Sequence, residues 1–440
     1  MREFHAIFII ACIAVLAPLL NRIPVFARAP IVAIELLLGM AVGPSGAGLV
    51  NADGALDFLR EFGLVYLFFQ AGFEFNQKEI SGKPLRLGFY AWLVSLSLSL
   101  VISAALYLLG LVEAPLLVAL ILPTTAFGIL ILMLRQAGEL DDEFGHYVLG
   151  VAAVSELGPL ILASIVLAQH DHHLHQTLLS ALFIAIGLAA IFLLKRVRSD
   201  RLAESIVHWL GDGELLPLRI AFVVLLGFVS FADRLGMELV VGSYMAGMAV
   251  AVLVRGTRAE ILKERLTAIG SGFLVPLFFI ESGVDFDLPA LVSSPASVVR
   301  FIFFCMAFLL IRLAPLNLFR GTLPERDMPA LALLSSTTLP LVVALTYLGV
   351  ARGQMAHETA SALVGAAMVT VTAFPTLAFW LRGTHQESRF ESGVSLVAHA
   401  VADWFSAQAS GVVAKLPSHW LEAIKAFEQR VFARFNRTEN

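Results

Sequence analysis

Long apolar stretches recur along the chain, each separated from the next by a short polar segment. A helix that crosses the hydrocarbon core of a bilayer needs about 20 mostly apolar residues. We predict a helix over each of about thirteen stretches: 4–20, 31–49, 56–73, 87–110, 115–134, 145–168, 176–194, 216–232, 237–254, 266–284, 297–316, 328–348 and 359–381. The pattern is typical of an all-α polytopic membrane protein.

Three pairs of these segments share short sequences in the same order. The shared sequences are Gly39–Val42 with Gly247–Val250, Leu64–Phe69 with Leu274–Phe279, and Pro123–Thr125 with Thr337–Pro340. Partners lie about 210 residues and seven segments apart, so the two members of each pair cross the membrane in opposite directions. Leu- and Phe-rich helices can match by chance once, but three matches with one offset predict an inverted-topology repeat, which many secondary transporters contain.

Composition agrees with a membrane protein. Hydrophobic residues make up 58% of the chain and charged residues 15%, whereas soluble domains are nearer 45–50% apolar and about 25% charged. The net charge of −4 and the lack of a basic stripe give no reason to expect a nucleic-acid partner. Cys12 and Cys305 both lie in apolar runs, so we interpret them as small hydrophobic residues and not as a disulfide framework.

Lysine and arginine predict the orientation, because cytoplasmic loops carry the excess of both residues. Loops after odd-numbered segments contain Arg22, Arg28, Lys78, Lys83, Arg86, Arg135, Lys195, Arg196, Arg198, Arg201, Arg255, Arg258, Lys263, Arg265, Arg320 and Arg326. Loops after even-numbered segments contain few, such as Arg234. We therefore expect the N-terminus outside and the C-terminus in the cytoplasm, in a bacterial inner (plasma) membrane, with the first apolar run retained as a helix.

We expect residues 1–381 to form the transmembrane domain, with one repeat at about 4–168, a linker helix at about 176–194 and the second repeat at about 216–381. The spacing of Val397, Val401, Trp404 and Phe405 in the 382–440 tail predicts amphipathic helices on the cytoplasmic surface. No Gly-rich phosphate loop suggests a nucleotide-binding domain there. One loop that is expected outside contains four histidines and an aspartate: His170, Asp171, His172, His173 and His175. These side chains could bind a metal or sense pH, or the loop could simply be solvated.

Two segments are predicted to be broken helices. Each places proline beside two threonines in the middle of an apolar run: Pro123, Thr124 and Thr125 in one, and Thr337, Thr338 and Pro340 in the other. Proline removes a backbone donor, so carbonyls, threonine hydroxyls and half-helix dipoles can face an ion. The alternative is a kinked helix whose threonines bond to their own backbone.

Glu156 is predicted to lie near mid-membrane and to bind ions, with Ser155 beside it. An ionised carboxylate at that depth costs on the order of 2.5–3.5 kcal/mol, so it persists chiefly where it faces a cavity or a partner. A carboxylate can hold a proton or coordinate a monovalent cation, and the two compete, which is sufficient for coupled exchange. The alternative is a protonated structural Glu hydrogen-bonded to a neighbouring helix.

Arg312, Glu35 and Glu281 are further charged residues within predicted segments. Arg312 remains charged and needs an anion or water, so we expect it to neutralise the region around Glu156 when no cation is bound. It could instead extend to the inner surface. Glu35 and Glu281 could line a funnel or be interfacial residues, and Glu74 and Asp285 are expected to end their helices.

The chain resembles the monovalent cation:proton antiporter superfamily, in particular bacterial sodium/proton exchangers and potassium-efflux antiporters. The residues that carry the resemblance lie within roughly 5–381: Glu35–Pro44, Phe62–Phe75, Pro123–Thr125, Glu156, Leu277–Asp287 and Arg312. It implies a thirteen-helix fold in which a dimerising scaffold supports a moving core, and two broken helices cross beside the ion site. Elevator-like movement would then expose that site to either side.

In that family the critical acid belongs to an Asp-Asp, Asn-Asp or Gln-Asp pair, and the matching positions here are Ser155 and Glu156. A second acid accompanies electrogenic exchange in the family, so its absence implies electroneutral, one-for-one exchange. Arg312 resembles the basic residue that faces the family's ion site. The partners implied are Na⁺ or K⁺, the proton, the lipid bilayer and a second copy of the chain in a homodimer.

Two other functions fit the sequence less well. A sodium-coupled carrier of a small organic anion can share inverted repeats and crossed helices, but polar residues near the expected site are few. A non-transporting sensor would need a signalling domain, which the short tail does not offer. We expect no enzyme activity and no cofactor, because the segments contain no metal-ligand cluster or nucleophile motif.

Overall fold

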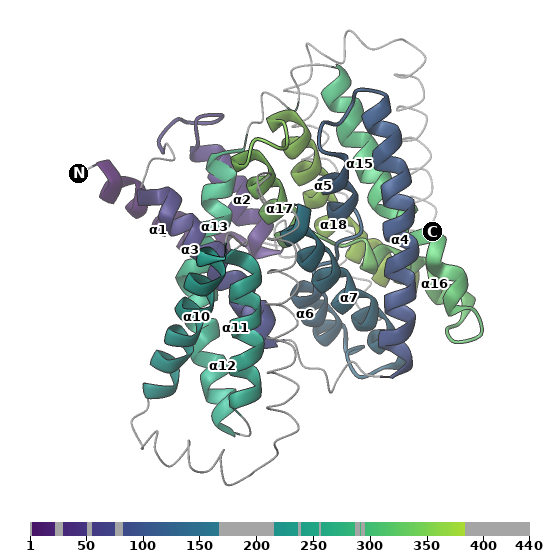
Figure 1. The fold of residues 1–440 in the computed structure, drawn as a ribbon, viewed down its shortest axis with the longest axis horizontal. Coiled ribbons are helices and arrows are strands. Elements are labelled where there is room, and N and C mark those ends of the chain that lie inside the picture. Colours follow the sequence, from purple (N-terminus) through teal and green to yellow (C-terminus); the bar gives the residue numbers. More distant parts are fainter. Residues whose placement is uncertain are drawn as a thin grey trace.

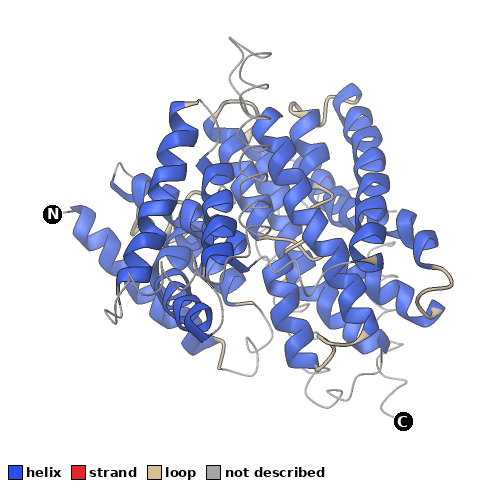
Figure 2. Ribbon diagram, turned by 60° about the horizontal axis from the view of Figure 1, so that its bottom comes forward, coloured by secondary structure: helices blue, strands red, loops and turns tan. Residues whose placement is uncertain are grey.

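The computed structural model describes residues 2–22, 30–50, 55–74, 82–166, 215–235, 239–254, 257–286, 291 and 295–382. Within these ranges the chain is built from helices, and the one β-type pairing is an isolated bridge between Arg320 and Leu323 (Figure 2). Seven of the helices are long and apolar enough to cross a membrane, and three shorter apolar helices accompany them. The predicted all-helical polytopic fold is confirmed.

The helices gather into two bundles, each of which takes helices from both sequence repeats (Figure 1). We name them the flanking bundle and the crossover bundle. The flanking bundle contains α1 (Arg2–Leu20), α2 (Ile31–Val42), α3 (Ala55–Glu74), α10 (Leu216–Arg234), α11 (Leu239–Leu253), α12 (Thr257–Ile269), the π-helical turn Gly270–Leu274 and α13 (Val275–Val284).

The crossover bundle contains the two predicted broken helices. Its elements are α4 (Lys83–Leu108), α5 (Pro115–Ile121), α6 (Phe127–Ala137), α7 (Glu143–Val166), α15 (Pro295–Leu313), 3₁₀ turns at Ala314–Phe319 and Glu325–Asp327, α16 (Met328–Ser335), α17 (Pro340–Ala351) and α18 (His357–Arg382). The predicted segments 115–134 and 328–348 are thus each divided into two short helices, as expected.

Two predicted boundaries were wrong. The helix expected over 31–49 ends at Val42 because Gly43 precedes Pro44, whose ring disfavours helical geometry at the preceding residue. The helix expected over 266–284 begins earlier, as α12, and continues through the π-helical turn into α13. Pro276 follows that turn and supplies no N–H to a helical ladder.

Some predictions lie outside the described residues. These are the linker helix at about 176–194, the histidine loop at 170–175 and the cytoplasmic tail after Arg382.

Reciprocal glycine crossings join the two repeats within the flanking bundle. A Cβ atom at Gly39 of α2 would overlap the Ile280 carbonyl oxygen of α13, and one at Gly247 of α11 would overlap the Phe69 carbonyl oxygen of α3. Gly39 and Gly247 are the equivalent positions of the sequence repeat. Each repeat therefore supplies one helix to each close crossing, which is the packing that an inverted repeat predicts.

The interface between the two bundles is largely apolar. One continuous cluster of buried side chains includes Phe68 of α3, Phe278 and Phe279 of α13, and Leu339 and Val342 of the crossover bundle. Apolar contacts are non-directional, so this interface imposes less angular specificity than a hydrogen-bonded one.

We predict that Gly247→Ala destabilises the protein by about 1–3 kcal/mol, because a close backbone crossing cannot accept a methyl group without shifting. The measurement is thermal unfolding of the purified protein in detergent. Gly227→Ala is the matched control, because a Cβ at Gly227 of α10 meets no atom within 4 Å. Equal unfolding temperatures for the two variants would show that the α3–α11 crossing is looser than described.

Candidate ion site at the crossing of two broken helices

The two helix breaks touch each other inside the crossover bundle. Residues 122–126 separate α5 from α6, and residues 336–339 separate α16 from α17. The Ala126 N–H of the first break donates a hydrogen bond of 2.8 Å to the Thr337 carbonyl of the second. Pro123 and Pro340 explain the breaks, since neither can donate to a helical ladder. The predicted crossing of discontinuous helices is therefore confirmed.

Threonine hydroxyls hold the breaks together. Oγ1 of Thr124 lies 2.8 Å from Oγ1 of Thr338, and Oγ1 of Thr125 donates to the Ser335 carbonyl at 2.5 Å. Thr337 instead bonds to the Leu333 carbonyl of its own helix at 3.2 Å. Thr124 makes both kinds of bond, because its hydroxyl also donates to the Ile121 carbonyl at 2.7 Å. Local bonding alone therefore fits Thr337 but not Thr124 or Thr125.

Thr370 of α18 also supports the crossing, and it was not predicted from the sequence. Its hydroxyl accepts the Thr338 N–H at 3.2 Å and lies within donor distance of the carbonyls of Thr338, at 3.0 Å, and Ala367, at 2.8 Å. A threonine in the middle of an apolar helix is a weak signal, because its hydroxyl can always bond to its own backbone.

A row of serines on α4 holds the first broken helix in place, and these residues too were missed. Ser95, Ser99 and Ser103 are buried and four residues apart, so they share one face of the helix. Ser99 donates to the Ala119 carbonyl of α5 at 2.8 Å, Ser103 to the Pro115 carbonyl at 2.5 Å, and Ser95 to the Ile311 carbonyl of α15 at 3.0 Å. The four-residue spacing was the available signal.

Arg312 connects the first break to α7. Its side chain is 1% exposed, which excludes the alternative that it extends to the surface. Nη2 donates to the Pro123 carbonyl at 2.5 Å and to Thr125 Oγ1 at 2.8 Å, while Nη1 donates to Ser155 Oγ at 3.1 Å. One guanidinium thus satisfies a carbonyl that the helix break leaves free and binds the residue next to Glu156.

Glu156 lies at the edge of this cluster, facing the flanking bundle. Successive residues of a helix point about 100° apart, so Ser155, which faces Arg312, directs Glu156 to another side of α7. Its carboxylate acts electrostatically on the phenol of Tyr244 in α11, and α7 packs against α11. Ser155 is buried and Glu156 is half-buried. The carboxylate is therefore placed at the interface between the bundles, close to the hydroxyl-rich crossing.

The arrangement suits a hard monovalent cation. Hydroxyl and carbonyl oxygens come together at the crossing in an apolar surrounding, and Glu156 follows Ser155 directly on α7. Carboxylate, hydroxyl and carbonyl oxygens are the donors that hard cations prefer. Among the described residues, no group of three or more His, Cys, Asp or Glu side chains could hold a metal ion in a conventional protein-ligated site.

Glu35 and Glu281 lie outside the crossing, in the flanking bundle. Glu35 of α2 is 4% exposed and Glu281 of α13 is fully buried, so other helices enclose both side chains, and their place along a funnel or at the membrane interface stays a prediction. Position along a helix does not reveal which flank another helix covers, and α2 and α13 cover each other here. Glu74 ends α3 and Asp285 directly follows α13, as predicted.

Comparison with known proteins gives one family across most of the chain. The family model described as "Sodium/hydrogen exchanger, transmembrane" matches residues 8–382. A Bacillus subtilis protein named as a candidate Na(+)/H(+) antiporter, YjbQ, is 26% identical over 82% of this chain and 59% of its own length. The Na(+)/H(+)-K(+) antiporter GerN of Bacillus cereus is 24% identical over 64% of this chain and 72% of its own length.

A solved structure has the same fold. The sodium proton antiporter MjNhaP1 of Methanocaldococcus jannaschii superposes with a TM-score of 0.58, covering 90% of this chain and 99% of that chain at 16% sequence identity. The chain spans less than two thirds of the length of YjbQ.

We predict that Arg312→Lys destabilises the protein by about 1–3 kcal/mol, although the charge is retained. An ammonium on a flexible stem cannot reproduce the forked contacts to Pro123, Thr125 and Ser155, so at least one buried acceptor loses its donor. Thermal unfolding in detergent measures the effect, and Arg320→Lys at an exposed position is the control. If both variants unfold at the wild-type temperature, the forked contact does not hold the break in place.

Proposed function

The chain belongs to the sodium/hydrogen exchanger family, and we propose that it exchanges a monovalent cation, Na⁺ or K⁺, for protons across the membrane. The observation that carries this proposal is the contact of two helix breaks, with Thr124 bonded to Thr338, next to the part of α7 that carries Glu156. Relatives that are named as Na(+)/H(+) and Na(+)/H(+)-K(+) antiporters support the same class of substrate.

Glu156 is the proposed exchanging group. In its ionised form the carboxylate attracts the cation, with hydroxyl and carbonyl oxygens of the crossing completing the ligand set. Protonation removes the charge, so the cation leaves. Because one carboxylate cannot hold both at once, each binding event on one side requires a release, and net exchange follows from the two gradients.

Arg312 is proposed to preserve the shape of the empty site. When the cation has left and Glu156 is ionised, a nearby guanidinium reduces the cost of a carboxylate in a low-dielectric surrounding. Its contacts with Pro123 and Ser155 keep it beside the site without occupying it. Loss of these Arg312 hydrogen bonds would therefore alter both the stability of the protein and its affinity for the ion.

An elevator-type movement is proposed for alternating access. The crossover bundle contains the site, and Glu156 lies where that bundle meets the flanking bundle across an apolar interface. Sliding the crossover bundle would expose the carboxylate to one side and then to the other. We propose that the flanking bundle is held in a homodimer in a bacterial plasma membrane, with the N-terminus outside and the C-terminus in the cytoplasm.

A sodium-coupled carrier of a small organic anion is the second candidate. Crossed helix breaks are compatible with it, because half-helix N-termini can bind an anionic substrate. Arg312, however, already donates to Pro123, Thr125 and Ser155. Both terminal nitrogens of its guanidinium are therefore bound to the protein. Sodium uptake that is stimulated by an organic anion and moves no protons would favour this candidate.

We predict that Glu156→Gln abolishes exchange, because an amide of the same shape can neither release a proton nor neutralise a cation. The measurement is dissipation of an imposed pH gradient in proteoliposomes on addition of NaCl or KCl. Glu113→Gln removes an exposed acid from the loop between α4 and α5 and is the matched control. Undiminished exchange in the Glu156 variant would refute the assigned role.

We also predict that exchange is electroneutral, since Ser155 stands beside Glu156 and supplies no second negative charge. Clamping the membrane potential with valinomycin and K⁺ gradients should leave the rate of Na⁺-driven proton movement unchanged. A rate that follows the imposed voltage would instead require a further charge to move in each cycle.

A further inference from the structure

Arg382, the last residue of α18, joins four helices at one end of the crossover bundle. Its Nε donates to Glu139 Oε1 at 3.1 Å, and its Nη1 lies 2.8 Å from Asp327 Oδ1. Its Cζ lies 3.7 Å from the ring centroid of Phe144 in α7. The side chains of Glu139, Asp327 and Arg382 are 5%, 11% and 13% exposed. The three charges are thus largely withdrawn from water and depend on one another.

The two acids mark the far ends of two half-helices. Glu139 follows α6, the half-helix that begins after the first break, and Asp327 directly precedes α16, the half-helix that leads to the second break. Gly138 ends α6 with a φ of 73°, a conformation that L side chains rarely adopt. The chain then turns closely back onto α7, where a Cβ at Gly145 would overlap the Glu139 carbonyl oxygen. This turn holds Glu139 within reach of Arg382.

The half-helices α6 and α16 are consequently connected at both of their ends. At the breaks, Ala126 and Thr125 donate to backbone carbonyls of the second broken helix. At the far ends, Arg382 bridges the two acids. Between these points α6 and α16 share an apolar cluster with α7 and α18, and apolar contacts impose little angular specificity. The polar connections at the ends therefore determine the angle between the two half-helices.

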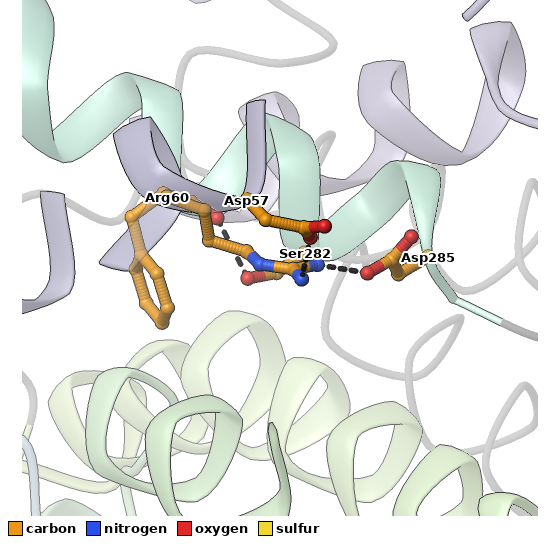
Figure 3. A network of polar contacts seen from close by, with 5 residues as sticks. Asp57, Arg60, Ser282 and Asp285 are labelled. Atoms are coloured by element: carbon orange, nitrogen blue, oxygen red, sulfur yellow. Dashed lines mark hydrogen bonds and ion pairs between the residues drawn. The ribbon is translucent and has the colours of Figure 1, made fainter. Parts of the chain in front are cut away.

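The other two half-helices, α5 and α17, make different contacts. They pack against each other, with Gly349 of α17 against an apolar side chain of α5. Tyr347 of α17 also contacts the flanking bundle, because the Cζ atom of Arg60 in α3 lies 4.3 Å from its ring centroid. Arg60 in turn is bound by Asp57 and Asp285 (Figure 3). Arg382 therefore acts on one half of each broken helix.

We propose that Arg382 is a positioning residue for the cation site, because it sets the angle between α6 and α16 and thereby the way in which the two breaks meet. Its contacts are with Glu139, Asp327 and Phe144, so it acts through the half-helices and does not bind the ion. Without this connection Glu156 can still bind a proton, but the oxygens of the crossing are less well placed for a cation. This inference rests on the proposed exchange function, to which it adds a residue that determines cation affinity.

The first test compares Arg382→Gln with Arg326→Gln in proteoliposomes, over a series of Na⁺ and K⁺ concentrations at fixed pH. Arg326 is the matched control, because it also lies near Asp327, at 3.9 Å, but is 86% exposed. In Arg382→Gln the KM for the cation should rise by about two- to thirtyfold, the range for residues that act on a site without touching the ligand, while the maximal rate is retained. Arg326→Gln should keep the wild-type KM. A variant that is only less stable would instead lose active protein, which lowers the maximal rate at an unchanged KM.

Glu139→Gln is the milder second variant, because it keeps the shape of the side chain and one acceptor oxygen for Arg382. Its KM for the cation should rise in the same direction. The double variant should show no larger KM than Arg382→Gln alone, since both changes break the same connection. If Arg382→Gln does not fold, Glu139→Gln decides alone, and an unchanged KM in it overturns the proposal.

Hydrogen exchange of backbone amides, followed by mass spectrometry on the purified protein, locates the effect in the structure. In Arg382→Gln, exchange should become faster in α6 and α16 and stay unchanged in α5 and α17. This pattern is expected because Arg382 connects only the first pair of half-helices.

Two results would overturn the positioning role: an unchanged cation KM in Arg382→Gln, or equal changes of hydrogen exchange in all four half-helices. Either result, with Glu156→Gln inactive, would leave the exchange function standing. Exchange that persists in Glu156→Gln would instead refute the proposed function, while the hydrogen-exchange comparison would still show whether Arg382 holds α6 to α16.

Discussion

The contact between the two helix breaks is the constraint on which the site depends. Breaking a helix inside a membrane exposes backbone groups that lipid cannot satisfy, and each unsatisfied group costs several kcal/mol. The protein meets this cost by bonding one break to the other, Ala126 to Thr337 and Thr124 to Thr338, and by placing Arg312 on the Pro123 carbonyl. A polar centre is thereby sustained within an apolar bundle, and a carboxylate can lie at its edge.

The rest of the crossover bundle serves to hold that centre rigid. The serines of α4 fix α5 through its carbonyls, and Thr370 of α18 fixes the second break. By contrast, the surface toward the flanking bundle is mostly apolar. Directional bonds inside one bundle and non-directional contacts between two bundles are the combination that the proposed elevator-type movement requires, because the first resists deformation and the second permits displacement.

Much of this architecture could be predicted from the sequence, for identifiable reasons. Proline beside two threonines in the middle of an apolar run was the signal for both breaks, at Pro123 and Pro340, and the repeat predicted that they would be equivalent. Proline alone was not a sufficient signal, because Pro159 lies inside α7 and Pro375 inside α18. A charge within a span has to be accommodated, so Arg312 and Glu156 were visible as well. The partners of these residues were not, because serine and threonine can always bond to their own helix, which makes Ser99 and Thr370 look neutral in sequence.

Contacts between residues on helices far apart in the sequence could not be predicted either. The contact of Arg60 with Tyr347 depends on which helices are neighbours, and the burial of Glu281 depends on which flank of α13 is covered by α2 and α3. Hydropathy gives the depth of a residue in the membrane but not its direction around the helix axis. The direction of Glu156, toward α11 and away from Arg312, likewise required the folded structure.

The reciprocal glycine crossings have a consequence for biogenesis. Because α2 of the first repeat crosses α13 of the second, and α3 crosses α11, neither repeat buries its glycine faces alone. During synthesis, α2 and α3 enter the membrane long before their partners leave the ribosome. The glycine faces of the early helices therefore stay unpacked until the later helices insert, and only then do the two halves of the polypeptide become one interlocked unit.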